Sequence, residues 1–167
     1  LSFSTEAVLR LLNVQLTSEQ TVTEEEVKNM IDEGTASGVF EPTEREIVKR
    51  VFRLGDLVVN ALMTPRTEIA ALDIQDSEKT IRRKLTLYDH SRYPIIRGTI
   101  DTILGMVVTK DLIGQTLEGK SINIALAMKP ALFVPAGMGA LDVLEKFKTE
   151  RFHCAIVTDE YGSVSGL

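Results

Sequence analysis

Thr109 and Asp111 are the residues whose types and spacing best suit the binding of a ligand. They follow residues 106–108, which are apolar and predicted to form a buried strand that leads into a helix starting near Thr109. Thr109 is expected to be the N-cap of that helix, with Asp111 in its first turn. A helix N-terminus offers unpaired N–H groups to a phosphate, and a carboxylate there can accept hydrogen bonds from both hydroxyls of a ribose. The stretch therefore indicates a nucleotide site, while the same residues also suit a helix cap that binds nothing.

Other kinds of chemistry find little support in the sequence. His90 and His153 lie far apart without metal-ligand spacing, and neither a Gly-x-Ser-x-Gly motif nor a P-loop is predicted. The acidic clusters are expected on a solvated surface, because a Mg²⁺ site would need carboxylates that converge in space. We therefore expect neither an enzyme nor a protein-bound metal ion.

The chain contains an internal repeat, which strengthens the nucleotide interpretation. Three landmarks recur in the same order: Met63-Thr64-Pro65 and Met128-Lys129-Pro130 (offset 65), Arg92-Tyr93-Pro94-Ile95-Ile96 and His153-Cys154-Ala155-Ile156-Val157 (offset 61), and Gly105-Met106 and Gly166-Leu167 (offset 61). Each unit is predicted to hold a strand, a helix, a second strand and a glycine-led third strand, at residues 69–72, 77–88, 93–96 and 106–108, and at 132–134, 140–149, 154–158 and from 166. A closing helix after Leu167 is expected by the repeat, so we interpret the chain as a fragment.

This pattern resembles a tandem CBS-domain pair, and more closely the cytoplasmic part of the CorC/HlyC family, which is related to the CNNM metal transporters. Met63-Thr64-Pro65-Arg66 and Ser91-Arg92-Tyr93-Pro94 are its most specific motifs. Further matching stretches are residues 23–27, 33–34, 38–41, 44–48, 51–56, 110–112 and 155–162.

The resemblance implies an α/β (mixed α+β) fold, a tandem CBS pair after an N-terminal helical segment. We assign residues 1–22 to an N-terminal helix and linker, 23–56 to a helical segment, 57–120 to the first CBS repeat and 121–167 to a truncated second repeat. Each repeat is expected to have a small mixed sheet with helices on one face, and the two are expected to pack through their sheets. Periodicity in 23–56 predicts one helix opened by Thr23 and Glu26 and ended by Gly34 and Gly38, and another from Pro42 to Gly55 with a buried apolar stripe at residues 47–54.

The resemblance also assigns roles to single residues. It places adenine against the main chain from Thr67 to Ile69, ribose on Asp111, and phosphates near Thr109 and Arg92. The resemblance also counts Ser91, Tyr93 and Pro94, with Arg92, among the nucleotide-binding residues. By residue type alone, Arg92 and Tyr93 suit a phosphate and a base, but they also suit an exposed arginine and a core-edge tyrosine. In the family, the Ser-Arg-Tyr-Pro cleft is completed by a Thr and an Asp of the second repeat, which this chain lacks, so one of two clefts is expected to be incomplete.

The implied function is regulation on the cytoplasmic face of the cell membrane. The module would bind an adenine nucleotide, ATP or AMP with or without Mg²⁺, and control Mg²⁺/Co²⁺ transport by a membrane domain. A homodimer and a C-terminal CorC/HlyC domain are implied as partners. The alternative is a CBS dimerisation scaffold without a ligand. A formal net charge of −5 argues against nucleic acid as a partner, and the single cysteine argues against a disulfide framework.

Overall fold

The computed structural model describes residues 22–167, so the helix predicted within residues 1–21 lies outside the described part. The described chain has a mixed α/β fold, as predicted, with six α-helices and two three-stranded sheets. It divides into two compact units, of which the first ends at Arg50 and the second runs from Val51 to Leu167.

Two helices dominate the first unit: α2 (Glu24–Ala36) and α3 (Pro42–Gly55), which continues into the second. The predicted capping box of α2 is confirmed, because Thr23 N donates to Glu26 Oε2 at 2.9 Å and Glu26 N donates to Thr23 Oγ1 at 3.3 Å. Of the two glycines predicted to end the helix, Gly38 does so, since it follows the C-cap Ser37 with a φ of 78°, whereas Gly34 lies inside α2, which continues to Ala36. Gly34 instead makes room for Phe40, whose ring would lie 2.7 Å from a Cβ at this position.

The predicted buried stripe of α3 is also wrong. No residue of α2 or α3 is buried, and the side chains of Ile47 and Val51 are 57% and 55% exposed. The helices instead share a polar contact, in which Asp32 pairs with Arg45 and, at 3.0 Å, with Lys49. An amphipathic pattern predicts an apolar face but not how deeply it is buried, and the other residues of this stripe, Val48, Phe52 and Leu54, are only half-buried.

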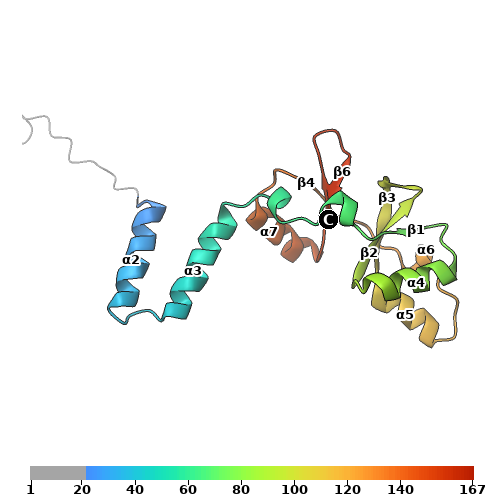
Figure 1. Ribbon diagram of the computed structural model, residues 1–167, viewed down its shortest axis with the longest axis horizontal. Coiled ribbons are helices and arrows are strands. Elements are labelled where there is room, and N and C mark those ends of the chain that lie inside the picture. The colour runs from blue at the N-terminus through green and yellow to red at the C-terminus, as the bar shows by residue number, and fades with distance from the viewer. Residues whose placement is uncertain (1–21) are drawn as a thin grey trace, which may run out of the picture. The chain divides into compact units, whose positions relative to one another are not determined.

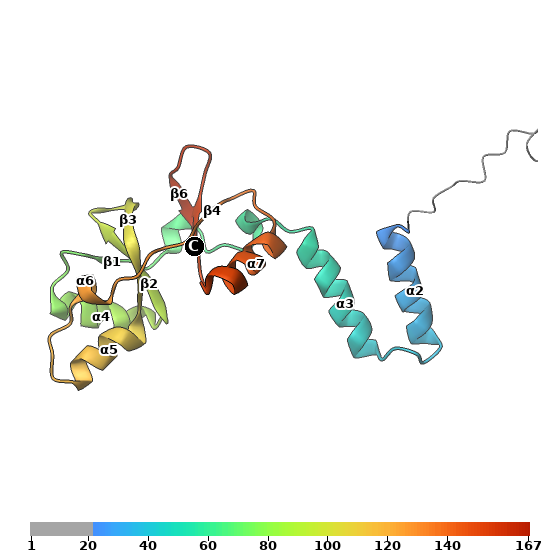
Figure 2. The ribbon, with the colours of Figure 1, turned by 180° about the vertical axis from the view of Figure 1, so that it is seen from behind.

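The first sheet has the order β1-β2-β3, formed by Leu72–Asp73, Arg92–Arg97 and Thr99–Val108. β1 runs parallel to β2, and β3 antiparallel to it. Helix α4 (Glu78–Tyr88) connects β1 to β2, and α5 (Thr109–Leu117) follows β3 directly. These two helices lie side by side (Figures 1 and 2), linked by a hydrogen bond from Arg82 to Thr116. The core beneath them is formed by Leu72, Ile81, Tyr93, Ile95, Val107, Leu112, Ile124 and Ala127.

The second sheet repeats this topology with shorter strands, β4 (Phe133–Pro135), β5 (Ile156–Thr158) and β6 (Val164–Gly166). Helix α7 (Ala140–Glu150) connects β4 to β5, as α4 does in the first repeat. The core of this half is formed by Val59, Leu132, Val134, Val143, Ala155 and Val157.

The segment that precedes each repeat in the sequence packs against the other repeat. The 3-10 turn η1 (Val59–Ala61) bonds to the second repeat, with Val59 N donating to Met138 O at 2.9 Å. Helix α6 (Ile124–Ala127) conversely packs into the core of the first repeat. The two halves therefore complete each other's cores through exchanged segments.

A third apolar cluster joins the two sheets. Met106 of β3, Ile156 of β5 and Val164 of β6 are buried together, with Ile103 and Leu167 packed against them. This confirms the prediction that the repeats pack through their sheets.

An ion pair fastens the outer ends of these sheets. Arg66, in the turn η2 (Arg66–Glu68), forms a two-pronged pair with Asp101 of β3, with Nη2 2.6 Å from Oδ2. Arg66 Nη1 also donates to Val164 O at 3.0 Å, and Val164 N donates to Asp101 Oδ1 at 3.2 Å. The hydrogen bond from Arg66, followed by that from the Val164 amide, holds the pKa of the Asp101 carboxyl below its usual value.

The pair of Arg66 and Asp101 should make the stability of the fold depend on pH in the acid range. A carboxyl whose pKa is lower in the folded state stabilises the fold above its unfolded pKa of about 4, and the contribution is lost as the pH falls through the folded pKa. We expect Asp101→Asn to lower the midpoint of thermal unfolding at pH 7 and to reduce its further fall between pH 5 and pH 2. The matched control is Glu160→Gln, which removes an exposed carboxylate on the turn before β6. Equal acid sensitivity of Asp101→Asn and the unaltered chain would contradict this expectation.

Candidate nucleotide site at the start of α5

Thr109 is the first residue of α5 and ties the helix to the preceding strand. Its amide donates to Ser91 O at 3.0 Å, and its hydroxyl donates to His90 O at 2.6 Å. The prediction that Thr109 is the N-cap is therefore wrong, because Val108 occupies that position and the Thr109 hydroxyl is used across the strands. The predicted passage from strand to helix at this point is confirmed, and it brings the start of α5 against the chain at residues 90–91.

The Ser91-Arg92-Tyr93-Pro94 motif divides into an outer and an inner half. Ser91 is exposed and Arg92 is half-buried, whereas Tyr93 and Pro94 are fully buried. Tyr93 packs in the first core, and its hydroxyl accepts a hydrogen bond from His90 N at 3.1 Å. Arg92 acts on Cys154 of the other repeat: burial raises the pKa of this thiol, and the charge of Arg92 partly offsets that effect. The half-buried Arg92 is partly accessible to solvent, while Tyr93 is part of the core.

Asp111 lies in the first turn of α5 and is already paired. Its Oδ2 atom accepts a hydrogen bond from Lys129 Nζ at 2.7 Å. Lys129 belongs to the entry segment of the second repeat, and only its place in the Met-Lys-Pro landmark could have marked it beforehand. Thr109, Asp111, Ser91 and Lys129 therefore meet at one helix start.

Thr67 and Ile69 are placed mainly by the second sheet. Thr67 is exposed in η2, which contacts β6, and Ile69 is packed against the cluster between the sheets. The contacts that the structure gives this segment run to that cluster and to β6 rather than to Thr109 or Asp111.

The prediction of no P-loop overlooked one match. Gly114 and Gly119 stand five residues apart and are followed by Lys120 and Ser121, which is the P-loop spacing. A phosphate loop needs a strand before it and a helix after the lysine, but Gly114 lies inside α5 and Lys120 pairs with Glu118 at 2.7 Å. The match is therefore a helix end and not a phosphate cradle. Among residues 22–167, no group of three or more His, Cys, Asp and Glu side chains could hold a metal ion.

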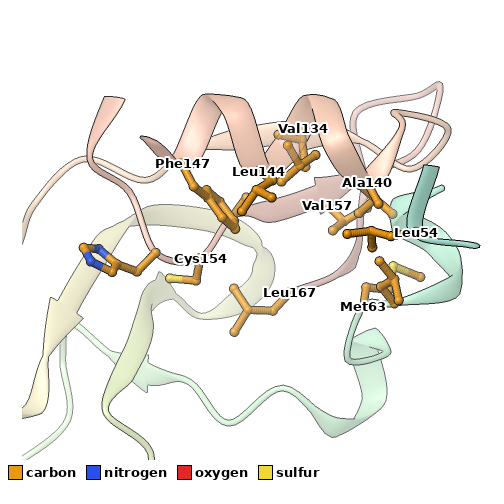
Figure 3. A pocket seen from close by; sticks show the side chains of 14 residues that line it. Leu54, Met63, Val134, Ala140, Leu144, Phe147, Cys154, Val157 and Leu167 are labelled. Atoms are coloured by element: carbon orange, nitrogen blue, oxygen red, sulfur yellow. The ribbon is translucent and has the colours of Figure 1, made fainter. Parts of the chain in front are cut away.

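An apolar groove of about 360 Å³ opens in the second repeat (Figure 3). Val134, Leu144, Phe147 and Leu167 line it, and Cys154 lies toward one end. The strand pairings give the corresponding residues of the first repeat, because Leu72 pairs with Ile95 as Val134 pairs with Val157. These positions are 62 residues apart, so the predicted strand offset of 61 is wrong by one. At the correct offset Tyr93, which packs in the core of the first repeat, corresponds to Ala155, which lines the groove.

Comparison with known proteins identifies the family of this chain. No protein-family model matches the chain. A UPF0053 protein of Synechocystis is 41% identical over 167 residues, which cover 100% of this chain and 37% of that protein. A solved CBS domain of a bacterial CNNM/CorC family Mg²⁺ transporter is 31% identical with a TM-score of 0.76, and the match covers 87% of this chain and 89% of that structure. The chain belongs to the CNNM/CorC family. The resemblance inferred from the repeat is confirmed, and this CNNM/CorC chain spans about 37% of the length of its Synechocystis relative.

Two further structures similar to this CNNM/CorC chain contain nucleotides. One is the CBS domain of a bacterial CNNM/CorC family Mg²⁺ transporter in complex with ATP, 30% identical, with a TM-score of 0.66 over 75% of this chain and 89% of that structure. The other is a CBS-domain pair with bound AMP from Klebsiella pneumoniae, 32% identical, with a TM-score of 0.61 over 66% and 90%.

Proposed function

We propose that this chain is a regulatory module that binds an adenine nucleotide, ATP or AMP, with or without Mg²⁺. The observation that carries the proposal is the double hydrogen bond from Thr109 to the main chain at residues 90–91. It sets the start of α5 beside Ser91 and Arg92, where a phosphate would meet both the N–H groups that follow Thr109 and a guanidinium. The ATP and AMP complexes of similar CBS domains support the choice of ligand.

The proposed roles follow from exposure. Asp111 would accept the ribose hydroxyls, and Thr109, Ser91 and Arg92 would face the phosphates. Tyr93 and Pro94 would act as the buried support of this edge. The main chain from Thr67 to Ile69 would receive the adenine, as the family resemblance implies.

Ligand binding would then shift the module between two conformations and bias a membrane domain elsewhere in a longer protein. The proposed output is divalent-cation transport, Mg²⁺ or Co²⁺, with the module on the cytoplasmic face as a homodimer and a C-terminal CorC/HlyC domain after it. The Mg²⁺ transporter that contains a similar CBS domain supports this proposal. None of the helices between residues 22 and 167 combines the length and the hydrophobicity of a membrane span.

A dimerisation scaffold without ligand is the second candidate function. It is favoured by apolar side chains on α4 and α5 that face solvent, since Leu87, Ile113 and Leu117 are 68%, 49% and 83% exposed.

Thermal unfolding with and without nucleotide separates these functions. At about a hundred times its dissociation constant, a nucleotide should stabilise the chain by about 2.7 kcal/mol, which raises the unfolding midpoint by several degrees. Asp111→Asn should abolish most of that shift, because the amide is a poorer acceptor for ribose hydroxyls. The control is Asp142→Asn, which changes the acidic residue in the first turn of α7 instead. If neither ATP nor AMP shifts the midpoint, with or without Mg²⁺, the scaffold remains.

A further inference from the structure

The ammonium group of Lys129 is bonded to the Asp111 carboxylate, which the proposed function assigns to ribose binding. Lys129 Nζ lies 2.7 Å from Asp111 Oδ2, and the side chains of Lys129 and Asp111 are 60% and 28% exposed. A ribose hydroxyl that takes this oxygen must therefore compete with the ammonium group.

The main chain fixes the origin of the Lys129 side chain. Lys129 N donates to Met106 O, and Met106 N donates to Lys129 O, both at 2.8 Å. Gly105 allows this approach, because a Cβ there would lie 2.5 Å from Lys129 O. Since Met106 stands three residues before Thr109, the lysine stem starts beside the first turn of α5.

The other repeat has the same main-chain arrangement with a different side chain. Thr64 N donates to Leu167 O at 2.8 Å, and Leu167 N donates to Thr64 O at 3.0 Å. Thr64 therefore stands where Lys129 stands in the Met-x-Pro landmark, but it carries no charge and is too short to span the same distance. The ammonium group is thus specific to the helix start that carries Asp111.

We propose that Lys129 makes the site at the start of α5 selective for phosphorylated nucleotides over nucleosides; the inference rests on the proposed function. A ribose that binds Asp111 displaces the ammonium group from its partner. A nucleotide offers that group a phosphate oxygen in exchange, and the flexible four-carbon stem lets it turn from one anion to the other. A nucleoside offers no anion, so its binding leaves the lysine without a charged partner.

The test compares adenosine and AMP as ligands by calorimetry, at fixed ionic strength, for the unaltered chain and Lys129→Met. Removal of the ammonium group should strengthen adenosine binding and weaken AMP binding. The dissociation constant of adenosine divided by that of AMP should therefore fall by about fivefold or more. This change is on the scale of one exposed ion pair. The control is Lys110→Met, which removes an exposed lysine next to Asp111 in sequence.

Each result has one meaning. A ratio that falls in Lys129→Met alone supports the inference. A ratio that is unchanged, or that falls equally in both variants, overturns the inference and leaves the proposed function intact. If none of the proteins binds either ligand, the proposed function and the inference fall together.

Discussion

Replacement of Leu112 by alanine is expected to lower the free energy of unfolding by about 2–5 kcal/mol. Leu112 is the fully buried residue of α5, packed in the first core with Tyr93 and Val107. Its truncation removes transfer free energy and leaves a cavity beneath the helix that presents Asp111. Chemical denaturation should show a lower midpoint with an unchanged slope.

Leu117→Ala is the matched control, because the same change is made in the same helix at a side chain that is 83% exposed. Its effect should stay within about 0.5 kcal/mol. Similar losses for both variants would mean that α5 is not anchored through Leu112.

Gly105→Ala is expected to destabilise the chain by about 1–3 kcal/mol, although it adds a single methyl group. The new Cβ would lie 2.5 Å from Lys129 O and 2.7 Å from Met128 Cγ, so the paired segments must move apart. One of these atoms belongs to the main chain, which cannot yield by a change of rotamer. Thermal unfolding should register a fall of about 2–4 °C for each kcal/mol.

Gly114→Ala is the control, and it is expected to raise the stability of the chain rather than lower it. Gly114 lies inside α5, and nothing lies within 4 Å of a Cβ built there. Alanine should stabilise the helix by about 0.5–1 kcal/mol. If both glycine variants lost stability to the same extent, the close approach at Gly105 would not be the cause.

Helix positions and the order of elements were readable from the sequence. Residues 77–88 and 140–149 were predicted as helices, and α4 and α7 confirm them within one residue at each end. Periodicity and helix-forming side chains act locally, so local sequence carries this information. The repeat also indicated the family correctly, because its landmarks are spaced by the fold itself.

The register of the repeat needed the structure. Ile95 was matched with Ile156 by residue type, whereas the strand pairing makes Val157 its counterpart. A shift of one residue turns a strand side chain to the opposite face of the sheet, and both neighbouring residues are apolar. Composition alone therefore could not decide between them.

The site was only partly predictable for a related reason. Thr109 and Asp111 were recognised because the signals for the start of a helix lie in neighbouring residues of the sequence. Lys129 was not, because its contact with Asp111 depends on the pairing of two segments from different repeats. The fully buried Tyr93 shows the converse, since its type suited a base but its strand faces the core.

The exchange of entry segments has a consequence for synthesis of the chain. Thr64 pairs with Leu167, about a hundred residues later, and Val59 belongs to a core otherwise built from residues 132–157. As the chain leaves the ribosome, the first sheet has all its strands by residue 108, yet the segment around Val59 must wait for the second. Such long-range contacts slow folding, and until the second repeat is made the apolar side chain of Val59 has no core to enter.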